Sequence, residues 1–327
     1  MLTVGVAARN EEATISHSLE SIENALAEIP GEGATELIVA VNDSTDRTRE
    51  LAEAFANRDP SRYRVIESEP GIVEAQRAVA RAAKAPDYLI FVDADCLLDR
   101  QCLRKLSEVM RDPTVQATWA QRVLAGPAKP GFWQALLNFG DYHRDVILRG
   151  HYVVGQAFAI RKYDVPYDSP SREPVPANVA AHLQLDRGPL TDDSYLSRAL
   201  IAAFGQDAIR PGNDAIVYAQ PMRSLRDLYR AQRRKAYEVE RLNLLFPELR
   251  GVRGKFFGRR FDSTAYARLT PAQRLQCRLY QRLYSGLWRL AQWQLATSLW
   301  LLKRGVPLRP CNIWPVVHGT KKPFPAT

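Results

Sequence analysis

The chain of 327 residues is 46% hydrophobic and 25% charged, which excludes extensive disorder and supplies enough apolar side chains for one large domain or two merged halves. Its net charge of +9 is unevenly distributed, because residues 1–110 carry 12 Lys/Arg against 20 Asp/Glu, whereas residues 217–327 carry 22 Lys/Arg against 5 Asp/Glu. The basic C-terminal third suits an anionic membrane surface or nucleic acid as a partner, or else it is a solvated basic surface.

Four strands that alternate with helices are predicted in the first 110 residues. Each apolar run is followed by a polar turn and then by apolar residues at helical spacing, with Asn10 and Asp46 placed to cap the first two helices. The strands are expected at residues 2–8, 36–41, 63–66 and 88–92. This alternation favours an α/β fold, in which helices cover both faces of a mostly parallel sheet.

The pattern changes beyond residue 113. We expect a strand at 115–120, a helix at 132–148 and a strand at 152–160, and the four prolines of residues 168–189 predict a long loop.

A basic amphipathic helix is predicted to begin at Pro271. Leucines recur there every four residues beside arginines, at Leu275, Leu279, Leu283 and Leu287 and at Arg274, Arg278 and Arg282. Because Trp288, Trp293 and Trp300 follow, this helix either lies at a membrane interface or packs on the body of the protein.

The cysteines and the lengths of the apolar runs indicate the cellular compartment of the protein. Cys96, Cys102, Cys277 and Cys311 are too few for a disulfide framework and form no C-x-x-C pair, so we expect reduced thiols. The first residues predict no signal peptide, and the longest uncharged apolar run, residues 290–302, is shorter than the about 20 residues that span a bilayer. A cytoplasmic protein is expected, either free or peripheral to the inner face of the membrane.

Two carboxylates follow the fourth predicted strand, at Asp93 and Asp95. Ligands of open α/β sheets gather at the carboxyl ends of strands, and Mg²⁺ prefers one or two carboxylates together with phosphate oxygens. The pair therefore indicates a site for a divalent cation and a diphosphate, although D-x-D also occurs by chance in surface turns.

Three segments, in order, resemble a family 2 glycosyltransferase of the GT-A fold. They are Ala8-Arg9-Asn10-Glu11-Glu12, Val41-Asn42-Asp43-Ser44-Thr45-Asp46 and Phe91-Val92-Asp93-Ala94-Asp95. The resemblance implies a Rossmann-like fold with a nucleotide-sugar-binding half at 1–112 and an acceptor-binding half at 113–245. It does not cover the last eighty residues, and the residue pattern predicts a basic helical extension at 246–327.

The resemblance also implies the donor site. Asp95, with Asp93, would hold Mn²⁺ or Mg²⁺, and Asp93 and Ala94 would contact a UDP- or GDP-linked sugar. Ala7, Arg9 and either Asn42 or Asp43 match the positions around the nucleobase. Arg77 would face the donor phosphates, or it is a solvated helix arginine.

On the acceptor side, Gly155–Arg161 resembles the glycine-containing strand before the acceptor loop, and Thr191-Asp192-Asp193 resembles the acidic signature at a helix start. Asp193 is the expected general base, which takes the proton of the attacking hydroxyl, and Asp192 could exchange roles with it. The alternative is a pair of residues that cap the helix.

Residues 232–236 resemble the Gln-x-x-Arg-Trp segment of processive members, but Lys235 and Ala236 replace its last two residues. Arg233 and Arg234 remain candidates for binding a diphosphate.

The sequence therefore predicts an inverting transfer of a single sugar to a hydroxyl acceptor, which is a glycan, a lipid or a small molecule. A nucleic acid partner is not expected. The alternatives are a nucleotidyltransferase, although no glycine-rich loop follows the first strand, and a non-enzymatic anion-binding module.

Overall fold

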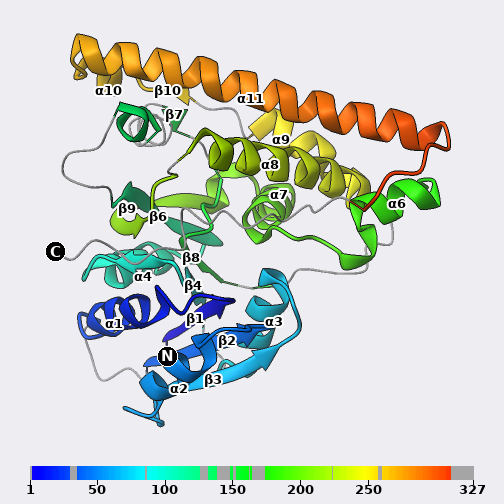
Figure 1. Cartoon of the computed structure of the whole chain (residues 1–327). Helices are drawn as coiled ribbons and strands as arrows, with labels where there is room; N and C mark the ends of the chain where they lie inside the picture. The colour runs from blue at the N-terminus through cyan, green and yellow to red at the C-terminus, as the bar shows by residue number, and fades with distance from the viewer. Residues whose placement is uncertain are drawn as a thin grey trace.

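The computed structural model describes residues 2–29, 35–84, 87–125, 132–137, 148–149, 152–161, 163, 174–222, 224–256 and 260–310. Within these residues an eight-stranded sheet is covered by helices, and a long C-terminal helix lies along one side of the molecule (Figure 1).

The sheet has the order β3-β2-β1-β4-β8-β6-β9-β5. Its first four strands are all parallel: β1 Leu2–Ala8, β2 Thr35–Asn42, β3 Tyr63–Ser68 and β4 Leu89–Asp93. The other four are β5 Cys96–Leu98, β6 Ala117–Leu124, β8 Ala157–Ile160 and β9 Ile209–Ala219. β8 is antiparallel to both β4 and β6, β6 is parallel to β9, and β5 is antiparallel to β9. The predicted α/β fold is confirmed, with a parallel N-terminal half and a mixed remainder.

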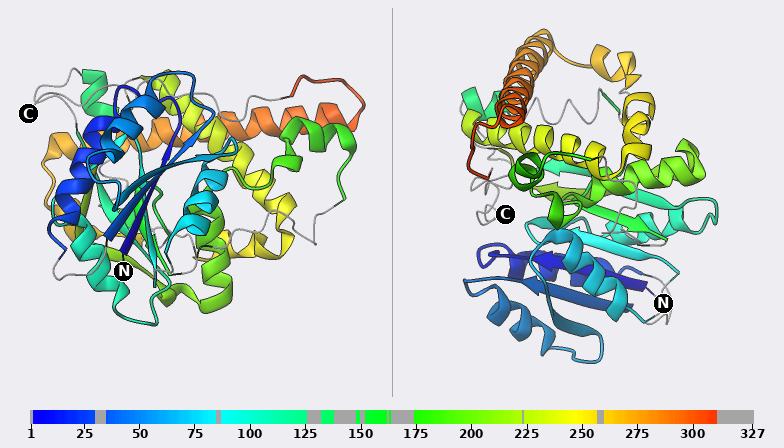
Figure 2. Two further views of the ribbon diagram at one scale, coloured as in Figure 1. Left: turned by 90° about the horizontal axis from the view of Figure 1, so that it is seen from below. Right: turned by 90° about the vertical axis from the view of Figure 1, so that its right-hand side faces the viewer.

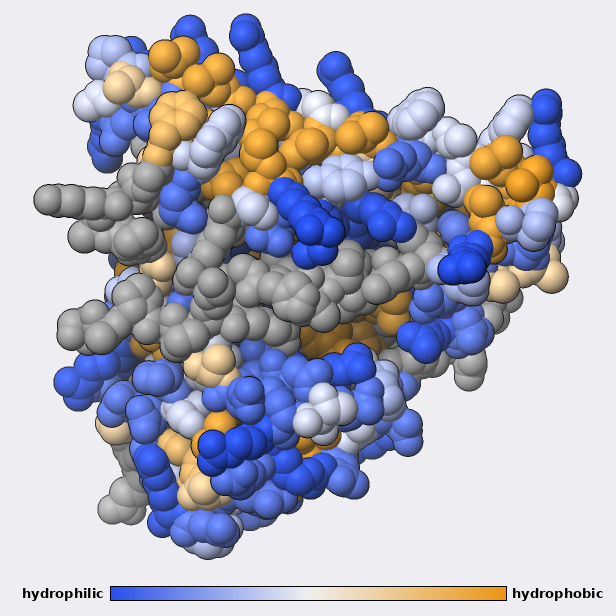
Figure 3. Space-filling view, viewed as in Figure 1, coloured by the Kyte–Doolittle hydropathy of each residue, from blue (hydrophilic) through white to orange (hydrophobic). Residues whose placement is uncertain are grey.

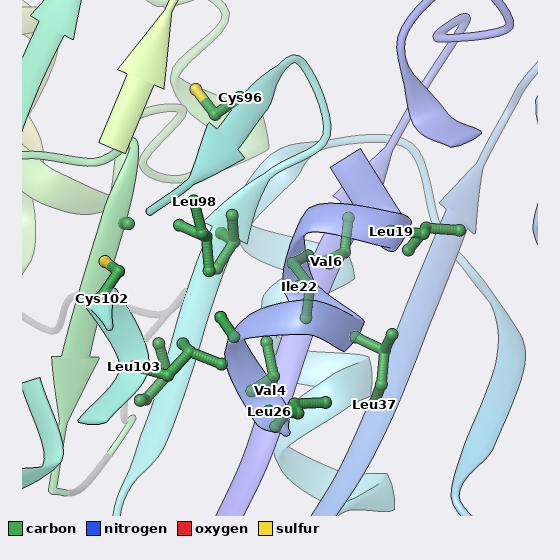
Figure 4. Packing of buried hydrophobic residues seen from close by; sticks show 14 of the residues in the cluster. Val4, Val6, Leu19, Ile22, Leu26, Leu37, Cys96, Leu98, Cys102 and Leu103 are labelled. Carbon is green, nitrogen blue, oxygen red and sulfur yellow. The ribbon is translucent and has the colours of Figure 1, made fainter. Parts of the chain in front are cut away.

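One face of the sheet packs on α1 Ile15–Leu26, α2 Thr48–Ala56 and α4 Cys102–Met110. The apolar residues of α1 recur every three or four positions, and Leu19 and Ile22 are completely buried. Figure 4 shows them beside Val4 and Val6 of β1, within the cluster that also includes Leu37 of β2. Alternate residues of the strands therefore form a continuous apolar layer under these helices.

The opposite face packs on α3 Ile72–Ala82, α7 Asp192–Phe204 and α8 Leu225–Leu245. Here β1 presents small residues, and Gly5 lets α3 come close: a Cβ at Gly5 would lie 2.6 Å from Val79 Cγ1 and 3.0 Å from the ring of Phe91. The close packing of α3 on β1 therefore depends on the missing side chain.

The described part of the C-terminal third is mainly helical, as predicted. After α8 come α9 Arg250–Phe256, α10 Ser263–Ala267 and α11 Pro271–Lys303. The side chains of Thr270 and Gln273 form a capping box at the start of α11. Both views show α11 alongside α8 (Figures 1 and 2), and the hydroxyl of Tyr229 donates to the side-chain oxygen of Gln294 across this contact. No helix within the described ranges has the length and apolarity that a membrane crossing requires.

Three local predictions are wrong. The segment 168–189, expected to be a loop, contains α6, Ala177–Leu183. A helix forms there because Val179 and Leu183 lie on one side of it and pack into the core. The helix expected up to residue 148 is helical at residues 132–137, but residues 148–149 form β7, which pairs with β10, Arg260–Phe261. The strand expected at 152–160 is limited to β8. Of these predictions, residues 138–147 and 168–173 lie outside the described residues.

The close approach at Gly5 gives a stability prediction. Gly5→Ala should lower the free energy of unfolding by about 1–3 kcal/mol, because the added methyl group overpacks the space between Val79 and Phe91. Gly286→Ala is the matched control: this glycine lies in α11 with nothing within 4 Å of an added Cβ, so alanine should stabilise by about 0.5–1 kcal/mol. Urea unfolding followed by circular dichroism measures both. Equal effects of the two substitutions would contradict the packing described for Gly5.

Candidate active site

The carboxyl ends of β1, β2 and β4 meet at one edge of the sheet. In the strand register Ala7 of β1 lies opposite Asp93 of β4, and Ala8 lies opposite Val41, the residue before Asn42. The backbone N–H of Asp93 donates to the carbonyl of Gln156 at 2.9 Å, which brings the start of β8 to the same edge. The sheet therefore places residues from four strands around Asp93.

Asp93, Asp95 and Cys96 form a potential metal site, because their ligand atoms all lie within 4.8 Å of one another. Burial raises the pKa of Asp93 well above its usual value, and the negative charges of Asp95, Asp192, Asp193 and Glu11 raise it further. A divalent cation would relieve this repulsion, and two carboxylates are the hard oxygen ligands that Mn²⁺ and Mg²⁺ prefer. The residues present therefore fit such an ion.

Asp192 and Asp193 begin α7 and differ in their surroundings. Asp192 is buried, and its Oδ2 accepts a hydrogen bond of 2.6 Å from Nε2 of Gln76 on α3. The hydroxyl of Tyr163 in turn donates to Oε1 of Gln76 at 2.7 Å. This chain of contacts fixes the orientation of the Asp192 carboxylate.

Asp193 faces the site. Gly155, just before β8, is close enough that a Cβ there would lie 3.7 Å from Oδ2 of Asp193. Burial and the charge of Asp192 raise the pKa of Asp193 to about 6, against the opposing effects of the Ser194 N–H, Lys235 and Arg234. A carboxylate with such a pKa can accept a proton near neutral pH.

Neither aspartate is the N-cap of α7, which is Thr191. Glu238 of α8 instead binds the turn before the helix, where its Oε1 accepts hydrogen bonds from the backbone N–H groups of Leu190 and Thr191, at 2.9 and 3.2 Å. The buried Arg241 donates to Oε2 of Glu238 at 3.0 Å and to backbone carbonyls of residues 183, 184 and 188. α8 therefore fixes the segment that positions Asp193.

Arg234 of α8 lies among the site carboxylates. Burial lowers the pKa of its guanidinium, while the negative charges of Asp193, Asp93, Glu238 and Asp95 act in the opposite direction. Its neighbour Arg233 packs over the ring of Tyr237, 5.6 Å from the ring centre. Of the two arginines proposed from the sequence as diphosphate ligands, Arg234 is the one surrounded by the acidic cluster.

A second group of predicted residues lies at the ends of β1 and β2. Nη2 of Arg9 and Oδ2 of Asp43 form an ion pair at 2.5 Å, and both side chains are about half exposed. Asn42 is buried, so Asp43 is the accessible member of the Asn42/Asp43 pair. Arg77 of α3 forms an ion pair with Glu74 on its own helix at 3.9 Å.

The predicted cap at Asn10 is wrong. α1 begins at Ile15, and Asn10 adopts a left-handed backbone with φ of 53°. Its Oδ1 accepts a hydrogen bond of 2.8 Å from the backbone N–H of Thr45 and so joins the loops after β1 and β2. Asp46 does act near the start of α2, because its Oδ1 accepts from the N–H of Thr48 at 3.0 Å.

Sequence reasoning missed Gln76 and Glu238. Both are polar residues at buried helix positions, Gln76 between Val73 and Val79 and Glu238 next to Tyr237. An uncompensated polar group at a core position is costly, so such a residue indicates a partner. The partners come from residues far away in the sequence, which the helical pattern alone does not reveal.

The partly parallel sheet and the carboxylate pair after β4 agree with the expected glycosyltransferase of the GT-A fold. Residues 3–165, about half of the chain, match the family model described as glycosyl transferase family 2. The protein belongs to this family, which confirms the resemblance noted in the sequence and favours glycosyl transfer over the nucleotidyltransferase and the non-enzymatic module.

Solved structures with a similar fold include two glycosyltransferases. Glucosyl-3-phosphoglycerate synthase from Mycobacterium tuberculosis, in complex with Mn²⁺, UDP-glucose and phosphoglyceric acid, is 18% identical, with a TM-score of 0.45 over 75% of this chain and 80% of that chain. A mannosyltransferase from Pyrobaculum calidifontis, in complex with GDP-mannose and Mn²⁺, is 20% identical, with a TM-score of 0.48 over 92% of this chain and 80% of that one. No curated protein matches the sequence.

The raised pKa of Asp193 predicts that Asp193→Asn stabilises the fold. Because the pKa is about 6 in the folded state and 3.8 in its reference state, the stability contributed by this group is fully present below pH 3.8 and is lost as the pH rises to about 6. At pH 7.5, in metal-free buffer, the asparagine variant should therefore unfold with a free energy on the order of 2–3 kcal/mol higher than the native protein. The difference should shrink by about half at pH 5.

Urea titrations at the two pH values measure this difference, with Asp87→Asn as the control, since Asp87 is exposed in the turn before β4. A stability gain for Asp193→Asn that does not change with pH would contradict the electrostatic cause.

Proposed function

We propose that the protein is an inverting, metal-dependent glycosyltransferase that moves one sugar from a UDP- or GDP-linked donor to a hydroxyl acceptor. The observation that carries this proposal is the convergence of a metal-competent carboxylate pair, a separate carboxylate with a pKa of about 6 and a guanidinium at one edge of the sheet. A direct displacement needs these parts: a site for the leaving diphosphate and a base for the attacking hydroxyl.

Asp95 and Asp93 hold Mn²⁺ or Mg²⁺ in this proposal. An ion held there would neutralise the charge that develops on the departing nucleoside diphosphate. Arg234 lies beside the same carboxylates, and its planar guanidinium matches the geometry of phosphate oxygens, so it binds the leaving group from the side of α8.

The nucleoside binds at the ends of β1 and β2. Ala7, Arg9 and Asp43 line the base, supported by the exposure of the Arg9–Asp43 pair, while Asn42 shapes the turn from below. Ala94 lies between the two metal ligands and contacts the donor through its backbone. Arg77 is assigned to the donor phosphates, in competition with its ion pair to Glu74.

Asp193 is the general base. The hydrogen bond from Gln76 and full burial occupy Asp192, which supports a fixed, structural carboxylate there and leaves Asp193 to take the proton of the acceptor hydroxyl. Since the base acts directly on the acceptor, no covalent nucleophile is needed, and the anomeric configuration inverts.

Transfer of a single sugar is favoured by α8. Ala236 stands where processive members of the family have tryptophan, and its small side chain is buried in the core.

We propose that residues 1–112 bind the donor and 113–245 the acceptor, with 246–327 as an extension. The acceptor is a glycan, a small molecule or a lipid-linked hydroxyl presented at the inner face of a membrane.

Metal dependence is tested with Asp95→Asn. In the native protein Mn²⁺ should strengthen the binding of UDP, GDP or their sugar conjugates, and loss of the ligand oxygen should reduce that gain by about 10–100-fold. Isothermal titration calorimetry with and without Mn²⁺ measures it. Asp99→Asn is the control. Asp99 lies four residues after Asp95, and asparagine can still accept the hydrogen bond that its Oδ1 receives from the backbone N–H of Gln101. If no sugar nucleotide binds more tightly with Mn²⁺, the proposed donor site is wrong.

The role of Asp193 is tested by turnover. Asp193→Asn should lower kcat by about 10²–10⁴-fold and leave the donor Kd within about twofold, because only proton transfer is removed. In the native enzyme kcat/KM should fall as the pH is lowered and Asp193 becomes protonated. NMR of the product should show the anomeric configuration opposite to that of the donor. Retention of configuration, or full activity of Asp193→Asn, would refute this assignment.

A further inference from the structure

The outward face of α11 carries large apolar side chains in contact with solvent. The helix buries Tyr280, Ala291, Leu295 and Leu302 against the body of the protein. The residues that it exposes are Leu275 at 58%, Leu279 at 41%, Leu290 at 42%, Trp293 at 65% and Trp300 at 51%, and we call these five the outer stripe. Figure 3 shows apolar side chains gathered along α11 on the face in view.

The spacing places the outer stripe on one side of the helix. At 3.6 residues per turn, Leu275 and Trp293 are separated by five full turns and lie on the same line along the helix. Arg282 and Trp300 have the same separation, so a basic side chain belongs to the same side. With 33 residues, α11 presents this side over about 50 Å.

The charge of α11 has a single sign. Between Pro271 and Lys303 there are five basic residues and no Asp or Glu; the basic ones are Arg274, Arg278, Arg282, Arg289 and Lys303. Arg304 follows, and its guanidinium lies over the ring of Trp300, 3.9 Å from the ring centre. No acidic group of the helix itself neutralises these charges.

More exposed aromatic surface lies beside the first half of α11. Residues 132–137 pack on Tyr280 and Leu283 through Leu136 and Leu137, and they expose Phe132 at 66% and Trp133 at 57%. Large apolar side chains that lie together and exposed on a protein surface indicate an interaction site.

The apolar outer stripe and the positive charge of α11 together distinguish three possible partners: a second copy of the chain, a nucleic acid and an anionic lipid surface. Two copies of α11 facing each other would bring together ten like charges, which opposes a self-associated pair. A nucleic acid duplex would satisfy the arginines but would leave the leucines of the outer stripe without apolar partners. An anionic lipid surface satisfies both, since tryptophan rings lie at headgroup level and long basic side chains extend to the phosphates.

We propose that α11 lies flat on an anionic lipid bilayer, with the outer stripe inserted into the headgroup and acyl boundary and with Arg278, Arg282 and Arg289 against the lipid phosphates. The surface is independent of the proposed sugar transfer, because no residue of the candidate active site belongs to it.

The test is flotation of the full-length protein with vesicles of phosphatidylcholine alone or mixed with phosphatidylglycerol. The protein should float with the mixed vesicles and much less with phosphatidylcholine, and added salt should weaken the binding. The double variant Trp293→Ser and Trp300→Ser should lose at least about tenfold in apparent affinity. Phe204→Ser is the matched control, since Phe204 is 59% exposed at the end of α7, outside α11.

The contribution of the arginines and the insertion of the tryptophans into the bilayer are tested separately. Replacing Arg278, Arg282 and Arg289 by glutamine should remove the preference for the anionic vesicles, whereas Arg111→Gln, an exposed site after α4, should not. Brominated lipids should quench the fluorescence of the native protein more strongly than that of the tryptophan double variant. Asp95→Asn should bind vesicles as the native protein does, so failure of the metal-site proposal and failure of this one are distinguishable.

Several outcomes would overturn the proposal. One is the absence of flotation with anionic vesicles at low salt, and another is equal binding by the native protein and the tryptophan variant. Retention on immobilised DNA that needs the three arginines but not the tryptophans, without vesicle binding, would assign the surface to nucleic acid. A dimer in light scattering that Trp293→Ser and Trp300→Ser dissociate, again without vesicle binding, would assign it to a second copy.

Discussion

Repulsion among carboxylates at one edge of the sheet is the constraint on which the site depends. Asp93, Asp95, Asp192 and Asp193 come from two separate parts of the chain, and burial together with their mutual charges raises the pKa of Asp93 and Asp193. A fold keeps such a group together only if other contacts supply the stability. Arg234 supplies a positive charge from α8, and a divalent cation held as proposed by Asp93 and Asp95 would supply more. Binding of such an ion would therefore stabilise the fold.

Hydrogen bonds from neighbouring helices oppose this repulsion. Gln76 holds Asp192 from α3, and Glu238 holds the backbone of the preceding turn from α8, where Arg241 holds Glu238 in turn. At the opposite end of the site, the loops after β1 and β2 are joined through Asn10 and Thr45. The loops after β1 and β2 and the turn before α7 are thus attached to another loop or to a helix, which favours a preorganised site.

The sequence predicted the parts of the fold and of the site that depend on local pattern. The four N-terminal strands, the carboxylate pair after β4 and the long basic helix all follow from periodicity and from residue type at a strand end. The contacts of Gln76, Glu238 and Asn10 could not be predicted, because each joins residues more than 30 positions apart. α6 was missed because prolines before it suggested a loop, whereas burial of Val179 and Leu183 stabilises a short helix. The residue roles drawn from the family resemblance stay predictions.

The order of strands affects how the protein is made. β5 directly follows Asp95, the proposed metal ligand, yet its partner is β9, with Cys96 opposite Ala219, so 122 residues separate the two in the chain. During synthesis on the ribosome, at about 5–20 residues per second, β5 therefore remains without its neighbour for several seconds. Loop closure over such a distance is slow, and an unpaired strand edge invites association with other chains. The family-matched segment, residues 3–165, ends before β9, so a nascent chain of that length lacks a strand that its own sheet requires.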